Sequence, residues 1–251
     1  MQYFPDRLKS ARKMNSLSLQ ELSDKLNNSF TKQDISRLEN GQIKPDSKTI
    51  FELCKALNVA TDFFTKKEVL QLEKVAFRKL SKLPVKKQDA VIHQTAEYLE
   101  RYMELEQLLG IQNKIPFKYE HFPISNENDI IEAASKLRKD FNIGFDPIFN
   151  IVELLEESGI KVFAVDTDPS FSGMSAKVND NLMVIVYNNT DELPLVRKRF
   201  TLLHELAHLY LNLSKFEEKE SEKLCDQFAG EFLLPSVKLK EYFRGKRETI
   251  F

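Results

Sequence analysis

His204-Glu205-Leu206-Ala207-His208 is the most informative stretch of this 251-residue chain. Histidines spaced four residues apart lie on one face of an α-helix, one turn from each other. Both imidazoles can then reach one metal ion, and Glu205 is placed to act on a water at that ion. Flanking apolar residues at the helical period predict a helix that begins near Asp191 and Pro194 and stops at Asn212. The alternative is a core helix with hydrogen-bonded histidines, which would have no need of Glu205.

A catalytic zinc ion commonly has three protein ligands and one open position, so a third ligand is needed. Residues 222–234 form a second helical pattern, for which Ser221 is the expected N-cap and Pro235 lies just beyond the end. Glu222 and Asp226 share one face of that helix. We expect Glu222 to be the third metal ligand and Asp226 to accept a histidine N–H, unless both belong to a solvated face. The other carboxylates that remain as alternative ligands are Glu218, Glu220 and Glu231.

These residue types suit the hydrolysis of a peptide bond. Zinc lowers the pKa of a bound water towards ~7 and polarises a carbonyl, and Glu205 would take the water proton and pass it to the leaving amine. The side chains available to stabilise the oxyanion are Tyr187, Arg199 and Tyr210. The sequence does not choose among them, although Tyr210 is expected to pack.

The two signatures resemble the ImmA/IrrE family of bacterial zinc metallopeptidases, which are gluzincin-like. The chain contains, in order, Arg199-Phe200-Thr201-Leu202-Leu203-His204-Glu205-Leu206-Ala207-His208 and Glu222…Asp226-Gln227-Phe228-Ala229. That family typically shows RFT-x-x-HE-x-x-H followed by E-x-x-A-[DN]-x-FA, and Cys225 stands here at the alanine position. The resemblance covers roughly residues 120–240. It implies proteolysis of a transcriptional repressor, often one with a helix-turn-helix domain, in stress or mobile-element control.

The remainder of this half alternates between helical and extended patterns. Helices are predicted at residues 128–142 and 146–158, and strands at 160–165, 171–178 and 182–187, with a turn at 179–181. The uninterrupted apolar run 182–187 favours a central strand, so 171–178 is the expected edge. Peptidases of this kind hold their substrate as an added strand on such an edge.

The first 66 residues carry 11 Lys and Arg against 8 Asp and Glu, although the whole chain has a net charge of −1. Five short helices are predicted at residues 4–14, 18–26, 31–39, 47–57 and 61–64. Ser18 and Glu21 form a capping box, and Thr31 caps the third helix. The residues expected in the core are Leu8, Leu17, Leu22, Leu26, Ile35, Leu38, Ile50, Leu53 and Leu57.

This region resembles the Cro/CI (Xre-type) helix-turn-helix through the segments Leu17-Ser18-Leu19-Gln20-Glu21-Leu22-Ser23 and Asp34-Ile35-Ser36-Arg37-Leu38-Glu39-Asn40-Gly41. The resemblance makes 31–39 the recognition helix in the major groove of double-stranded DNA. The residues implied at that surface are Lys32, Gln33, Ser36 and Arg37, with Lys44 and Lys48 near phosphates. Leu19 replaces a phosphate-contacting glutamine, and Asp34 adds a negative charge. Both departures weaken the DNA assignment, which remains the expected one, and the alternative is a helix-turn-helix that only docks another protein.

The segment 67–110 is helix-forming with a break at Leu83-Pro84. Its second piece could pack on either domain or form a dimer seam, and a homodimer fits the palindromic sites of Cro-type domains. An ordinary packing or surface role is expected for His93. We expect a helix-turn-helix domain at 1–66, a helical connector at 67–113, and a zincin-like α+β metallopeptidase domain with a small sheet at 114–251.

A hydrophobic content of 42% supports real cores, and no stretch reads as a secretory signal or membrane span. The two cysteines, Cys54 and Cys225, fall in different expected domains, so free thiols and a cytoplasmic location are expected. Three functions are compatible with these features: a zinc endopeptidase with its own DNA-binding domain, a transcriptional regulator whose peptidase-like half senses a metal or ligand, and a toxin–antitoxin or prophage regulator. Glu205 favours the endopeptidase, because a sensor needs no general base.

Overall fold

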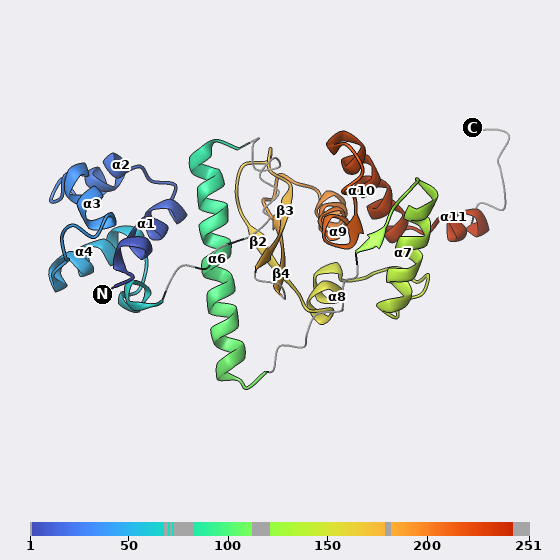
Figure 1. The fold of residues 1–251 in the computed structure, drawn as a ribbon, viewed down its shortest axis with the longest axis horizontal. Coiled ribbons are helices and arrows are strands. Elements are labelled where there is room, and N and C mark those ends of the chain that lie inside the picture. Colours follow the sequence, from blue (N-terminus) through green and yellow to red (C-terminus); the bar gives the residue numbers. More distant parts are fainter. Residues whose placement is uncertain are drawn as a thin grey trace. The chain divides into compact units, whose positions relative to one another are not determined.

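The computed structural model describes residues 2–67, 70, 72, 83–111, 121–178 and 182–242, and its ribbon is drawn in Figure 1. The chain divides into two compact units, one containing the described residues up to 111 and the other those from 121 onwards. Helices in both units and small sheets in the second confirm the expected fold class, mainly α plus α+β. None of the described helices is both long enough and apolar enough to span a membrane.

The first unit is helical. It contains α1 (Phe4–Met14), α2 (Leu19–Lys25), α3 (Lys32–Glu39), α4 (Ser47–Leu57), the 3-10 helix η1 (Thr61–Thr65) and α6 (Val85–Leu108). The predicted capping box of α2 is present, since Ser18 Oγ accepts from the Glu21 amide and Glu21 accepts from the Ser18 amide. The core of the first four helices includes Leu8, Leu22, Ile35, Leu38, Leu53 and Leu57, as expected, together with Phe4, Phe63 and Phe64. Local caps and apolar spacing were therefore sufficient to predict these helices.

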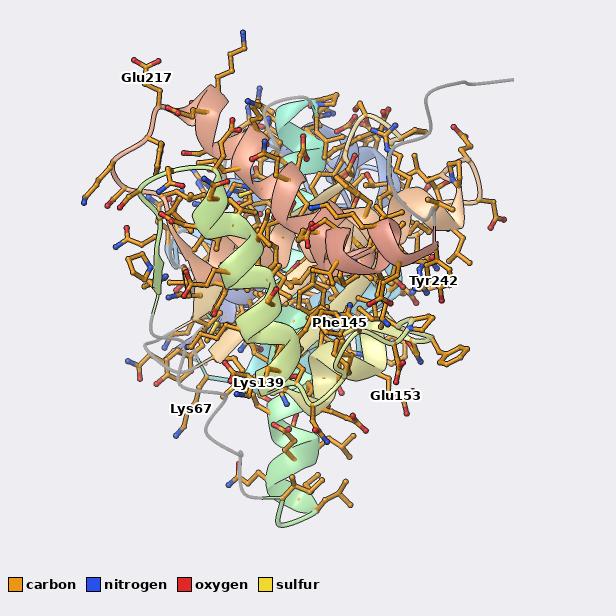
Figure 2. All side chains as sticks on the ribbon, turned by 90° about the vertical axis from the view of Figure 1, so that its right-hand side faces the viewer. Lys67, Lys139, Phe145, Glu153, Glu217 and Tyr242 are labelled. Atoms are coloured by element: carbon orange, nitrogen blue, oxygen red, sulfur yellow. The ribbon has the colours of Figure 1, made fainter. Side chains whose placement is uncertain are left out.

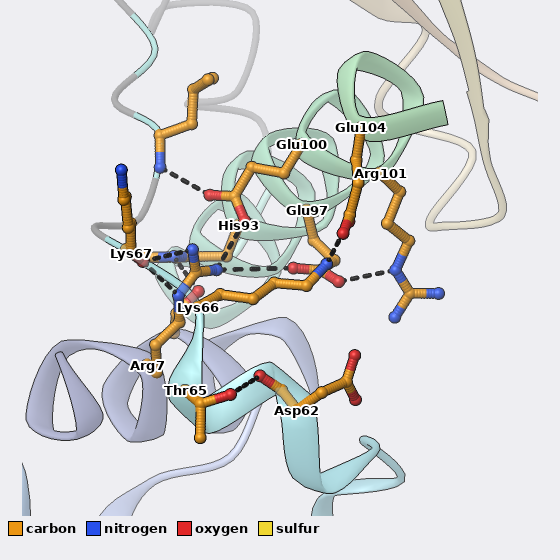
Figure 3. A network of polar contacts seen from close by, with 12 residues as sticks. Arg7, Asp62, Thr65, Lys66, Lys67, His93, Glu97, Glu100, Arg101 and Glu104 are labelled. Carbon is orange, nitrogen blue, oxygen red and sulfur yellow. Dashed lines mark hydrogen bonds and ion pairs between the residues drawn. The ribbon is translucent and has the colours of Figure 1, made fainter. Parts of the chain in front are cut away.

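Helix α6 is the second helical piece of the connector segment. It packs on α1, within the first unit. Three polar pairs follow one another along the two helices, and Figure 3 shows the first: Arg7 with Glu100 (2.6 Å), Ser10 with His93 (3.0 Å), and Lys13 with Asp89 (3.1 Å). The order of these pairs means that α1 and α6 run antiparallel. Burial lowers the pKa of His93 to about 4, so the imidazole is neutral at pH 7. The part of the connector at 68, 69, 71 and 73–82 lies outside the described residues.

The second unit combines a three-stranded sheet with helices. Its elements are β1 (Phe122–Pro123), α7 (Asn128–Asp140), α8 (Ile151–Glu157), β2 (Ile160–Val165), β3 (Gly173–Val178), β4 (Leu182–Asn188), α9 (Leu195–Tyr210), β5 (Leu211–Asn212), α10 (Glu218–Leu233) and α11 (Ser236–Tyr242). The sheet order is β2-β4-β3, with β4 parallel to β2 and antiparallel to β3. This order confirms the central position of β4 and the edge position of β3. The short strands β1 and β5 pair in parallel and were not predicted.

Helix α9 is the centre of the second unit. It contacts β3 and β4 on one side and α10 on the other, as Figure 1 shows. Figure 2 shows α10 crossing α7, with Glu217 labelled just before the start of α10. The core that joins these layers includes Leu137, Ile185, Leu203, Leu206, Phe228 and Phe232. The HExxH helix is therefore held on both sides by packed apolar surface.

The helix predicted at 146–158 is wrong in its first five residues, because α8 begins at Ile151 and Asn150 is its N-cap. Two arginines use the backbone carbonyls of the preceding loop. Arg138 donates to the carbonyl of Asp146, and Arg199 donates to those of Ile148 and Phe149. Both arginines lie outside the segment, Arg138 at 8 residues from Asp146 and Arg199 at 51 residues from Ile148, so the helical pattern of the loop could not reveal these hydrogen bonds.

Three other predicted boundaries differ from the structure. Ser221 is not the N-cap of α10, because the helix begins one turn earlier at Glu218. Negative charge in that first turn is favourable beside the helix dipole. Helix α7 ends at Asp140, two residues before the predicted end, and Asn142 adopts a left-handed conformation (φ 54°). Strand β3 begins at Gly173 rather than at 171, and the predicted turn at 179–181 lies outside the described residues.

Candidate metal and peptidase site

Two histidines of α9 and one carboxylate of α10 meet in the second unit. The Nε2 atoms of His204 and His208 lie 3.2 Å apart. Glu222 places Oε2 3.5 Å from Nε2 of His204 and Oε1 3.1 Å from Nε2 of His208. The three residues expected to bind the metal are thus brought together at one point.

The spacing of these three residues fits a divalent cation. In a tetrahedral zinc site with bonds of ~2.05 Å, the ligand atoms lie roughly 3.3 Å from one another. The two imidazole nitrogens lie 3.2 Å apart, and the two oxygens of Glu222 lie 3.1 Å from Nε2 of His208 and 3.5 Å from Nε2 of His204. Two imidazole nitrogens and a carboxylate also form a donor set that zinc prefers. The side chains therefore fit zinc in both geometry and chemistry.

The second nitrogen of each imidazole meets a side chain of α10. Nδ1 of His204 lies 2.7 Å from Oδ1 of Asp226, the acceptor expected from the sequence. Nδ1 of His208 lies 3.6 Å from Sγ of Cys225, a fully buried cysteine that forms no disulfide. His204, His208 and Cys225 also offer ligand atoms within 4.8 Å of one another, so they form a second group that could hold a metal. In the sequence, Cys225 was noted only at the family's alanine position, and this contact was not predicted.

Glu205 is almost completely buried, with 1% of its surface exposed. Ser175 on the edge strand β3 donates a hydrogen bond from Oγ to Oε2 of Glu205 at 3.1 Å. Gly173 on the same strand lets β3 approach α9, because a Cβ there would lie 2.6 Å from Cγ2 of Thr201. Ser175 was not predicted. The available signal was the period of two in an extended strand, which puts residues 173 and 175 on the same face.

The structure distinguishes the three candidate oxyanion groups. The guanidinium of Arg199 donates hydrogen bonds to two backbone carbonyls of the loop before α8, those of Ile148 and Phe149. Tyr210 packs beside Phe122 and Phe228, which confirms the expected packing role, and burial raises the pKa of Tyr210 to about 12. Tyr187 lies on β4, where burial, followed by the nearby charge of Glu156, raises its pKa.

The alternative third ligands lie elsewhere on α10. Glu218 and Glu220 occupy its first turn. Glu231 accepts hydrogen bonds from the amide and hydroxyl of Ser236, where α11 begins. Glu222, which lies within 3.5 Å of both imidazoles, is the carboxylate that this arrangement favours.

In the first unit, the residues expected to face DNA lie on α3, in the loop that follows it and in the first turn of α4. Lys32, Gln33, Arg37, Lys44 and Lys48 are exposed, and Ser36 is half-buried. Asp34 accepts hydrogen bonds from the backbone amide and hydroxyl of Thr31, which lowers its pKa. Its carboxylate is therefore committed to capping α3, where negative charge also offsets the helix dipole.

The recognition-type helix α3 is fixed to α1 by a bidentate ion pair. Arg12 donates from two nitrogens to the two carboxylate oxygens of Glu39, at 2.7 and 2.8 Å. Leu19, which replaces the expected phosphate-contacting glutamine, is half-buried against the core. The helix-turn-helix frame is thus complete, although one expected phosphate contact is absent at Leu19.

Comparison with family models finds one match in each unit of the chain. Residues 8–64 match the family described as Helix-turn-helix, and residues 155–251 match the peptidase family described as IrrE N-terminal-like domain. Both matches confirm the resemblances drawn from the sequence motifs. No curated protein and no solved structure gave a significant match.

Proposed function

Because the chain joins an Xre-type helix-turn-helix domain to an IrrE-like peptidase-family domain, we propose that it is a zinc-dependent endopeptidase of a bacterial regulatory switch. Its proposed substrate is a helix-turn-helix transcriptional repressor. The convergence of His204, His208 and Glu222 within 3.5 Å is the observation that carries this proposal. In the proposed site, zinc is held by His204, His208 and Glu222. Glu205 is the general base, and Asp226 orients His204.

Zinc, when bound, would act as a Lewis acid on the scissile carbonyl and would acidify a water. The carboxylate of Glu205 then accepts a proton from the water and returns it to the leaving amine. The hydrogen bond from Ser175 restrains that carboxylate, because it holds Oε2 at 3.1 Å. A buried base held in one orientation needs little rearrangement before proton transfer.

The proposed substrate path follows β3. This strand is an edge of the described sheet, so an extended peptide can pair with it through main-chain hydrogen bonds. Ser175 lies on β3 and touches Glu205, so a peptide paired along β3 would pass beside the general base. An unfolded or exposed segment of a repressor would fit this mode of binding.

The proposed role of the first unit is to bind double-stranded DNA in the cytoplasm and so bring the peptidase to its target. Six side chains support it: Lys32, Gln33, Ser36 and Arg37 for bases or nearby phosphates, and Lys44 and Lys48 for phosphates. A homodimer would match two such helices to a palindromic site. The alternative remains a helix-turn-helix that docks only to protein.

The experiment uses the purified full chain and repressors encoded beside its gene. We expect one bound zinc ion per chain and cleavage of a neighbouring repressor. Glu205→Gln should retain zinc and lose cleavage, because it removes the base but none of the three proposed ligands. Zinc retained without cleavage by either form would refute the endopeptidase and favour the sensor of a metal or ligand.

A further inference from the structure

We propose that Cys225 is a positioning residue of the metal site, which holds the imidazole of His208 through its thiol sulfur. Sγ lies 3.6 Å from Nδ1 of His208, and the side chain is fully buried. The proposal rests on the proposed metal site, but it requires neither a particular substrate nor peptidase activity.

The two histidines are held in the same way by consecutive residues of α10. Asp226 meets Nδ1 of His204, and Cys225 meets Nδ1 of His208. A neutral imidazole has one N–H, so a proton that Nδ1 donates leaves Nε2 with a free electron pair. The carboxylate of Asp226 only accepts, so its contact selects the tautomer of His204 in which Nε2 can bind a cation. In our proposal the sulfur of Cys225 accepts the N–H of His208 in the same way and selects the same tautomer.

The geometry also argues against Cys225 as a ligand in place of Glu222. Nε2 of His208 lies 3.2 Å from Nε2 of His204 and 3.1 Å from Oε1 of Glu222. The candidate ligand atoms therefore meet at the Nε2 edge of the His208 ring. The sulfur lies at the Nδ1 edge of the same ring. A zinc–sulfur bond is only ~2.3 Å long, so one cation cannot bind both Nε2 of His208 and the sulfur across the ring.

A thiol is a weaker hydrogen-bond acceptor than a carboxylate. His208 is thus held less firmly than His204, whose partner is the carboxylate of Asp226 at 2.7 Å. An alanine at position 225 would offer no acceptor at all. Loss of such an outer partner typically weakens metal binding by roughly 10–100-fold, and a thiol should lie near tenfold.

The test measures zinc affinity of the full chain by competition with a chromogenic chelator. We expect the dissociation constant of Cys225→Ala to rise by about tenfold. Cys225→Ser restores an acceptor, so its affinity should return towards that of the unmodified protein. The matched control is Cys54→Ser, which removes the chain's other cysteine. Cys54 lies in the first unit, so this variant should leave the zinc dissociation constant unchanged. All four proteins should bind one zinc ion at saturation.

Cobalt substitution supplies an independent spectroscopic readout. If sulfur is not a ligand, the cobalt protein shows no thiolate-to-cobalt charge-transfer absorption. Such a band that disappears in Cys225→Ser would overturn the proposal and make Cys225 a ligand. If Cys225→Ala binds zinc as tightly as the unmodified protein, or if Cys225→Ala and Cys225→Ser lose the same affinity, the proposal is wrong and Cys225 has only a packing role. Failure of the metal site itself is distinguishable, because the unmodified protein would then bind zinc no better than His204→Ala.

Discussion

Replacing Gly173 by alanine should destabilise the second unit and disturb the proposed general base. A Cβ at this position would lie 2.6 Å from Cγ2 of Thr201, 2.8 Å from the carbonyl oxygen of Val186 and 3.4 Å from Cγ of Glu205. The threonine can rotate, but the carbonyl belongs to the neighbouring strand β4 and cannot. Strand β3 must therefore shift relative to both β4 and α9, and the hydrogen bond from Ser175 to Glu205 is disturbed with it.

Overpacking in a core costs about 1–3 kcal/mol, and a contact with fixed backbone belongs at the upper end, so we expect about 3 kcal/mol. One kcal/mol lowers the melting temperature of a unit of this size by about 4 °C, which predicts a fall of about 12 °C. The matched control is Gly230→Ala in α10, where a Cβ meets nothing within 4 Å. Alanine is the better helix former, so this variant should gain about 0.5–1 kcal/mol.

Calorimetry of the full chain measures both variants through the unfolding transition of the second unit. Opposite signs are expected for the same chemical change in the same unit. Gly173→Ala should also lose cleavage of a substrate while it retains zinc, since it displaces Glu205 and not the metal ligands. A Gly173→Ala variant as stable as the unmodified protein would refute the reasoning that links the glycine to the approach of β3 and α9.

The remaining predictions concern single hydrogen bonds and ion pairs. Ser175→Ala removes one charge-assisted hydrogen bond to Glu205, so it should lower kcat by about tenfold. KM and zinc content should not change. A parallel loss of zinc would contradict a role of Ser175 that is confined to Glu205. Arg12→Met should cost about 3 kcal/mol in urea unfolding, because it leaves the buried carboxylate of Glu39 unpaired, and Glu39→Gln added to it should recover part of the loss. Burial lowers the pKa of His93 from 6.5 to about 4, so the folded state is stabilised above pH 6.5 and loses roughly 3 kcal/mol as the pH falls towards 4. The free energy of unfolding, measured by denaturation between pH 7 and pH 4, should show this loss. In His93→Gln the free energy of unfolding should depend less on pH over the same range.

Local signals were sufficient for much of the fold. The capping residues Ser18, Thr31 and Asp46 precede three helices of the first unit, and the first two were read from the sequence as caps. Caps and the helical period act over a few residues, so they are legible without the rest of the chain. The apolar run of β4 likewise indicated a central strand, which the sheet order confirms.

The two candidate metal-site motifs were visible in the sequence for the same reason, because the residues of each motif are one helical turn apart. His204 and His208 share a face of α9, and Glu222 and Asp226 share a face of α10. The spacing placed each pair on its own helix. The contact between the two pairs depends on how α9 packs against α10, which neither motif contains.

Packing between distant segments determined the rest. The pattern from 146 to 150 is helical, yet Arg138 and Arg199 take its carbonyls and the segment remains a loop. Cys225 occupies the alanine position of the family pattern, and only the packing of α10 against α9 places its sulfur beside His208. The amino-acid order specifies which groups are present and which face of an element they share. Folding brings Cys225 to His208, 17 residues away, and Arg199 to Ile148, 51 residues away, and hydrogen bonds at those separations leave no periodic trace in the sequence.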